Sequence, residues 1–264
     1  MKIAHEAPIS IFPTIQRMTD YDYALVHLFE SNMVYYRMFK DAVINGREVI
    51  LDNSIFELGE SFDGDTYFKW IEKLQPTWYI IPDILEDTLG TLRKMDKWQA
   101  KYITNPAIKT IGVVQGKTYK EIVECYKDIA PRVDKVAISF DYSYYIASTE
   151  NLKPINKYAA WMFGRQMLLR NLIDDGIIDT NKPHHLLGCG LPQEFIAYKD
   201  YKWVDSVDTS NPIVHGLNGV AYRPTGLDDK ISTKLIEYMS EEVTDTQLAI
   251  IKDNVTQFRK FCGR

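Results

Sequence analysis

The sequence has few cysteines, no long apolar run and no excess of positive charge, and each absence removes a class of protein. Its three cysteines, Cys125, Cys189 and Cys262, form no CxxC pair, so neither a zinc ribbon nor a disulfide framework is indicated. The net charge of −5 over 264 residues argues against non-specific coating of nucleic acid. No segment approaches ~18 apolar residues and no apolar signal region opens the chain, so we expect a cytoplasmic protein without a membrane partner.

Apolar, strand-like runs recur along the chain instead. Six are clear: EVILDNS (48–54), TWYIIPD (77–83), TIGVVQG (110–116), KVAISFD (135–141), HHLLGCG (184–190) and WVDSVDT (203–209). They are nearly continuous in apolar character, which is typical of strands covered on both faces of a parallel sheet. We expect two less clear strands in IAHEAPISIF (3–12) and in the segment 211–222.

Helical patterns separate these runs. They cover 20–45, follow the capping boxes Thr118-x-x-Glu121 and Thr244-x-x-Gln247, and include a helix over 154–175 that ends at Gly176. Alternating strands and helices predict the α/β class, as a single (β/α)8 TIM-like barrel domain over residues 1–264. An open doubly wound sheet is the alternative, but it requires a glycine-rich phosphate turn after the first clear strand, and DNSIFELG is not one.

Acidic side chains stand where the apolar runs end. The ends carry the aspartates Asp52, Asp83, Asp141, Asp205 and Asp208 and the amide Gln115. One such aspartate is as readily a helix cap as a functional group, but several at the C-terminal rim of a barrel point to chemistry. Because His184 and His185 lie at a strand start and no HxH ends a strand, we expect no metal. Carboxylates also cleave glycosidic bonds and bind the paired donors of a guanine edge, so the set predicts removal or exchange of a purine base.

The order of these segments is similar to that of a known family. LDNSIFE, YIIPDILED, IGVVQGKT, VAISFD, HHLLGCGLPQEF and WVDSVDTSNP together resemble the tRNA-guanine transglycosylase superfamily over residues ~48 to ~220. The family's CxCxxC…His zinc subdomain has no counterpart here. The chain is therefore most similar to the zinc-free viral (phage) DNA-guanine transglycosylases that insert 7-deazaguanines, which would place it in the host cytoplasm.

The resemblance implies a mechanism and a set of roles. It implies a pentosyltransferase that exchanges guanine for a preQ0-like, queuosine-related 7-deazaguanine in DNA through a covalent Asp–sugar intermediate, without a cofactor. Asp205 falls at the nucleophile and Asp52 at the residue that handles the proton of the base. The positions that bind the base correspond to Asp83, Gln115, Gly116, Phe56, Leu187 and Gly188.

The departures from the family pattern leave alternatives open. Asn53, Ser54 and Ile55 replace the family's Ser-Gly-Gly. A tRNA substrate, a purine N-glycoside hydrolase that uses the same carboxylates, and a catalytically idle binding subunit are the competing hypotheses. For contacts with nucleic acid, the candidates in loops after strand ends are Lys117, His215 and Arg223.

Overall fold

The computed structural model describes residues 1–231 and 235–264 of the chain. Eight strands belong to one sheet in the order β1-β8-β7-β6-β5-β4-β3-β2, and the strand pairs with a defined register are parallel. Helices connect successive strands, so the chain has the predicted α/β class and the (β/α)8, TIM-like barrel architecture. Its contacts group it into unit 1 (Met1–Asp20, Ser139–Gly176 and Leu186–Arg264) and unit 2 (Tyr21–Ile138 and Ile177–His185).

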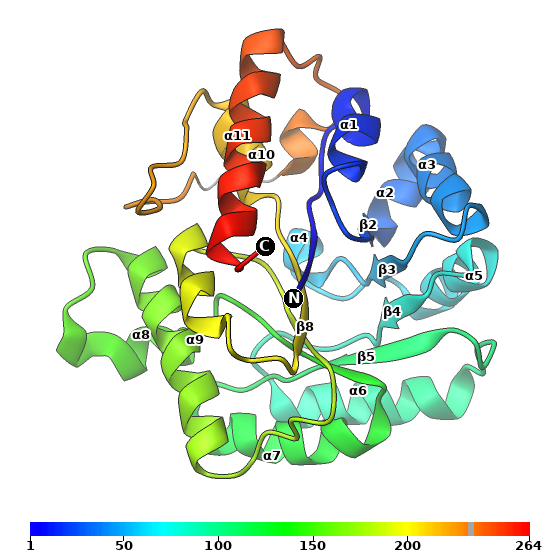
Figure 1. Ribbon diagram of the computed structural model, residues 1–264. Coiled ribbons are helices and arrows are strands. Elements are labelled where there is room, and N and C mark those ends of the chain that lie inside the picture. Colours follow the sequence, from blue (N-terminus) through cyan, green and yellow to red (C-terminus); the bar gives the residue numbers. More distant parts are fainter. Residues whose placement is uncertain (232–234) are drawn as a thin grey trace. The chain divides into compact units, whose positions relative to one another are not determined.

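Unit 2 is a run of parallel strands joined by helical crossovers. Its strands are β2 (Asp22–Leu25), β3 (Val49–Asp52), β4 (Trp78–Ile80), β5 (Lys109–Val113) and β6 (Lys135–Ile138), and β7 (His184–Leu186) begins in it. Its helices are α2 (Val26–Ser31), α3 (Met33–Ile44), α4 (Ile55–Leu58), α5 (Gly64–Leu74), α6 (Thr88–Lys101) and α7 (Tyr119–Ile129), followed by the 3-10 turn η2 (Ala130–Arg132). Helices α6 and α7 lie side by side (Figure 1).

Unit 1 contains strands β1 (Lys2–Ala4) and β8 (Val204–Asp208), which pair in parallel. Its helices are α1 (Phe12–Gln16), α8 (Ser143–Thr149), α9 (Lys157–Asp174), α10 (Asn211–Leu217) and α11 (Asp245–Phe261). Its 3-10 turns are η1 (Ile9–Ile11), η3 (Glu150–Leu152), η4 (Pro192–Tyr198) and η5 (Leu235–Tyr238). Helix α8 packs on α9, and α10 packs on α11 (Figure 1).

Of the two less clear strands, one was predicted at the correct place and the other was not. Strand β1 (Lys2–Ala4) overlaps the start of the segment 3–12, where a strand was expected. The other prediction is wrong, because Asn211–Leu217 is helix α10, with Pro212 in its first turn. The remaining strand is β2 (Asp22–Leu25), inside the segment that the helical pattern had covered.

The two predicted capping boxes are present in the structure. Thr118 and Thr244 each accept a hydrogen bond from the backbone of the residue three positions later, and both complete their capping boxes. These caps fix where α7 and α11 begin, and the α7 cap lies five positions after the last residue of β5.

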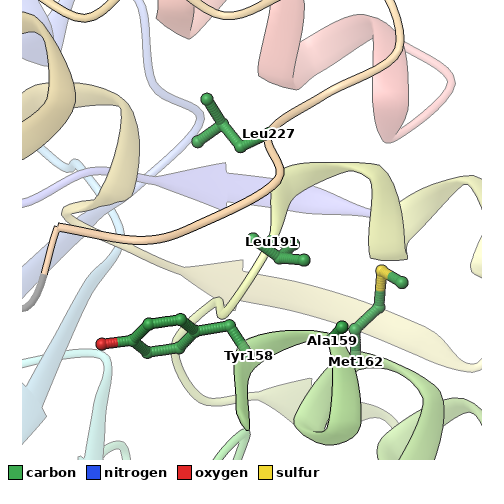
Figure 2. Packing of buried hydrophobic residues seen from close by; sticks show 5 residues of the cluster. All are labelled: Tyr158, Ala159, Met162, Leu191 and Leu227. Carbon is green, nitrogen blue, oxygen red and sulfur yellow. The ribbon is translucent and has the colours of Figure 1, made fainter. Parts of the chain in front are cut away.

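A hydrophobic cluster in unit 1 holds the segment after α10 against α9. Figure 2 shows Leu227 above Leu191, with the side chains of Tyr158, Ala159 and Met162 on the helix below. The amide of Gln193 binds both backbone groups of Leu227, donating to its carbonyl at 2.6 Å and accepting from its N–H at 3.0 Å. The cluster therefore anchors this segment by packing and by hydrogen bonds.

Candidate functional site

Three of the predicted polar residues meet at the C-terminal ends of consecutive strands of unit 2. Asp52 is the last residue of β3, while Asp83 and Gln115 follow β4 and β5 by three and two residues. Since the three strands are parallel and in register, their ends lie at one edge of the sheet. All three side chains are buried.

Asp83 is the centre of this group. Asn53 Nδ2 donates to Asp83 Oδ1 at 2.8 Å, and Gln115 Nε2 donates to Asp83 Oδ2 at 2.7 Å. Backbone N–H groups fix how both amides are turned, because Ile55 N donates to Asn53 Oδ1 at 3.0 Å and Glu86 N donates to Gln115 Oε1 at 2.8 Å. Asp83 is thus a carboxylate held between two oriented amides.

Burial raises the pKa of Asp83, and the hydrogen bonds from Asn53 and Gln115 oppose that effect. Only 1% of the residue is exposed. The sequence indicated Asp83 and Gln115 but not Asn53, which stands where the family has serine. We call Asp52, Asn53, Asp83 and Gln115 the acid–amide cluster.

Asp52 has a separate set of partners. The hydroxyl of Tyr23 donates to Asp52 Oδ2 at 2.6 Å, and the Ser54 N–H donates to Oδ1. Ser54 has φ of 60°, a left-handed conformation that favours glycine, and it occupies a glycine position of the family pattern. Tyr23 lies on β2, the strand that the sequence did not reveal, so no local pattern could have paired it with Asp52.

Glycine and aromatic candidates flank the acid–amide cluster in unit 2. A Cβ on Gly116 would lie 2.9 Å from the backbone nitrogen of Ile122, so only glycine fits beside the start of α7. Phe56 lies on α4 with 46% of its surface exposed.

In unit 1, the two aspartates of strand β8 lie three positions apart. Asp208 is the last residue of β8 and lies opposite Ala4 of β1. Asp205 is the second residue of the strand, about 10 Å before its end at a rise of about 3.3 Å per residue. Asp205 therefore does not lie at the strand end, where the sequence had placed it together with Asp208.

The segment after β7 is held by a buried ion pair that the sequence did not indicate. Arg165 of α9 donates from Nη1 to the Leu187 carbonyl at 2.9 Å and from Nη2 to the Gly188 carbonyl at 3.1 Å. Its Nε donates to Glu194 at 2.6 Å, and Tyr198 donates to the same carboxylate oxygen at 2.6 Å. Arg165 falls on the buried stripe of α9, and a charged residue on that stripe was the only signal in the sequence.

Gly188 connects this network to the end of β8. Its N–H donates to Asp208 Oδ1 at 3.4 Å, and its φ is 64°. A Cβ at Gly188 would lie 2.4 Å from the Phe140 ring, so no larger residue fits there. The predicted base-binding residues Leu187 and Gly188 are both half-buried.

His5 is a further buried group of unit 1, immediately after β1. Its Nδ1 lies 2.8 Å from the Thr209 carbonyl oxygen, which makes Nδ1 the protonated nitrogen of a neutral ring. Burial lowers the pKa of His5 to about 4, although the Thr209 carbonyl and the charge of Asp208 act in the opposite direction.

The three candidates for nucleic-acid contact have different surroundings. Lys117 and Arg223 are exposed, and Arg223 pairs with Asp228 at 2.6 Å. His215 was predicted in a loop, but it lies within α10 and is 2% exposed. Its Nδ1 contacts the Asn211 carbonyl at 2.8 Å, and burial lowers its pKa, so His215 does not meet a phosphate in this conformation.

Within residues 1–231 and 235–264, no group of three or more His, Cys, Asp or Glu side chains is arranged to hold a metal ion. In the same part of the chain, no helix combines the length and apolar character needed to cross a membrane. No protein-family model matches the chain, and no curated protein shows significant similarity to it. The family assignment stays a prediction from the quoted segments.

Proposed function

We propose that this chain is a pentosyltransferase that exchanges guanine for a 7-deazaguanine in DNA. The observation that carries the proposal is the acid–amide cluster, in which Asp52, Asp83 and Gln115 occupy the C-terminal ends of three consecutive parallel strands. These are the positions at which the resemblance implies proton handling and base binding. The grouping also argues against helix capping as the role of Asp83, since its carboxylate binds two side-chain amides.

The proposed reaction proceeds by two displacements at C1′ of the sugar. An aspartate attacks C1′ as the bond from C1′ to N9 of guanine breaks, and guanine leaves with a proton that Asp52 delivers. The incoming 7-deazaguanine then gives a proton to Asp52 and attacks C1′, which breaks the Asp–sugar bond. Atoms and charges balance without a cofactor.

We assign the attack on C1′ to Asp208. The alternative nucleophile is Asp205, which the resemblance implies. Catalytic groups of parallel barrels lie at the C-terminal ends of strands, and Asp208 holds that position on β8. The Gly188 N–H binds the carboxylate of Asp208 and helps to orient it.

Base binding requires a change of partners at Asp83. Guanine offers an N1–H and an exocyclic amine as donors and O6 as an acceptor. On binding, Gln115 Nε2 would turn from Asp83 to O6, and the N1–H of the base would take its place on the Asp83 carboxylate. Asp83 and Gln115 thereby each exchange their mutual hydrogen bond for one to the base.

The test is release of radiolabelled guanine from DNA and, in parallel, from tRNA. Release from DNA only when a 7-deazaguanine is present supports the proposal, whereas release to water without an acceptor base would identify a hydrolase. Release from tRNA alone would move the activity to the tRNA branch. No release from either polymer, with a folded protein, would leave the binding subunit as the remaining hypothesis.

The two aspartates of β8 are compared with conservative variants. We expect Asp208→Asn to abolish both exchange and the trapped protein–DNA adduct, because an amide is a poor nucleophile. Asp205→Asn is the matched control and should retain most activity. The reverse result would return the nucleophile to Asp205.

A further inference from the structure

A groove of about 170 Å³ in unit 2 combines lysines with aromatic side chains. One wall is helix α6, from which Lys94, Lys97 and Lys101 line the groove. Their spacing of three and four residues puts them on one face of the helix. They extend over about 10 Å, the length of about three stacked nucleotides at about 3.4 Å each.

Aromatic residues form the apolar part of the same groove. Trp98 is buried, while Phe62 and Tyr102 are partly exposed. Tyr102 is fixed in place, since its ring lies 4.4 Å from Trp98 and its hydroxyl donates to Asp65 at 2.7 Å. Flat side chains held beside cations match the composition of sites that bind single-stranded nucleic acid by stacking and by phosphate contact.

The groove is joined to the acid–amide cluster through the backbone of residue 83. Lys94 Nζ donates to the Asp83 carbonyl at 3.3 Å, and Ser61, next to Phe62, donates to the same oxygen at 2.5 Å. Phe62 N also donates to the Asn53 carbonyl at 3.0 Å. A strand lying in the groove would therefore lie next to the cluster that binds the exchanged base.

Charge favours a polyanion as the occupant. Lys101 pairs with Asp65 at 2.7 Å, but both side chains are more than half exposed, so the pair is weak and yields readily to a phosphate. Lys97 is exposed. Three lysines on one helical face concentrate positive charge locally, although the chain as a whole has a net charge of −5.

We propose that this α6 groove binds a single-stranded nucleic-acid segment that flanks the exchanged nucleotide, with the lysines on its phosphates and Phe62 against a base. The inference rests on the proposed function for the identity of the polymer. It predicts binding of an oligonucleotide without guanine, which the exchange reaction cannot use.

Fluorescence anisotropy of labelled dT12 tests the groove without base exchange. We expect Lys97→Ala/Lys101→Ala to raise the Kd about tenfold and to lower the slope of log K against log salt by about 1.4, or 0.7 for each lost phosphate contact. Phe62→Ala should raise the Kd about fivefold through lost stacking, with a smaller change in slope. The matched control is Lys120→Ala/Lys127→Ala on α7, which removes the same charge from exposed positions outside the groove.

The inference is overturned if both double variants bind dT12 equally well, or if wild-type protein does not bind dT12 at low salt. Displacement of dT12 by polyglutamate as effective as by unlabelled dT12 would also overturn it, in favour of an acidic protein partner. Circular dichroism and thermal unfolding of every variant exclude misfolding as the cause. Groove-dependent dT12 binding without guanine exchange would support the groove and reject the proposed function, and exchange with groove-independent binding would do the opposite.

Discussion

Asp83 in unit 2 and Glu194 in unit 1 are both 1% exposed, but their partners differ in charge. Asp83 lies between the neutral amides of Asn53 and Gln115, whereas Glu194 binds the guanidinium of Arg165. Amides satisfy the oxygens of a carboxylate without neutralising it, while a guanidinium cancels the charge as well.

This difference separates a site that can accept a ligand from one that stabilises the fold. The charge of Asp83 remains available to donors of an incoming molecule, and the amide of Gln115 is a partner that can be replaced at little cost. Neither Arg165 nor Glu194 has a partner that can be replaced in this way, because removing one leaves the other charged and buried. The first region suits recognition, and the second suits the rigid support of the Leu187 and Gly188 carbonyls.

The largest expected effect is from breaking the buried ion pair. We expect Arg165→Met to lower the free energy of unfolding by about 3–5 kcal/mol, because Glu194 is left buried without its cation. Arg170→Met on the same helix is the control: its pair with Asp174 is exposed, and its loss should cost under about 0.5 kcal/mol. Urea unfolding measures both. Equal losses in the two variants would show that burial does not make the Arg165–Glu194 pair more important to stability than the exposed Arg170–Asp174 pair.

Acid should destabilise both units through one histidine in each. Burial lowers the pKa of His5 in unit 1 and of His184 in unit 2 to about 4, from 6.5 in the unfolded chain. Between these two pH values the unfolded chain binds more protons than the folded chain. The contribution of each histidine to the free energy of unfolding is therefore fully present above pH 6.5 and is lost as the pH drops toward 4. Each histidine should contribute up to about 3 kcal/mol to that loss.

Urea unfolding at pH 7, 5.5 and 4.5 measures this dependence. His5→Gln and His184→Gln should each flatten it by a similar amount. A change confined to one variant would show that acid unfolding begins in that unit alone.

Replacing Asp83 by its amide should have an intermediate effect. In Asp83→Asn, one of the two amide N–H groups of Asn53 and Gln115 faces another donor, which should cost about 1–3 kcal/mol. Asp63→Asn is the control, because asparagine caps helix α5 as well as aspartate does. Thermal unfolding compares the two, and a loss in Asp83→Asn no larger than in the control would show that the amides reorient freely.

The sequence predicted the elements whose signals are local. Strand β3 was found because its apolar run is continuous, and α7 because its capping box is intact. Strand β2 was missed because it begins with an aspartate that binds Arg47 and leads directly into α2, so that its apolar residues continue into the helical pattern. A short strand of this kind has no periodicity to detect.

The candidate site follows the same division. Asp52, Asp83 and Gln115 could be predicted because each ends an apolar run in its own stretch of sequence. The hydrogen bond between Asp52 and Tyr23 and the ion pair between Arg165 and Glu194 each join positions 29 residues apart. No pattern within one element contains such pairs, so only the folded chain reveals them.

The smallest effect concerns two residues with the same backbone conformation, one in each unit. Ser54 has φ of 60° at a buried strand end, and Lys153 has φ of 48° in an exposed turn. Lys153→Gly should stabilise the chain by about 0.5–1 kcal/mol, because glycine adopts this conformation without steric cost. Ser54→Gly should gain less, since it also loses the hydrogen bond that the His27 N–H donates to Ser54 Oγ. Thermal unfolding measures the difference, and a larger gain for Ser54→Gly would show that strain is concentrated beside Asp52.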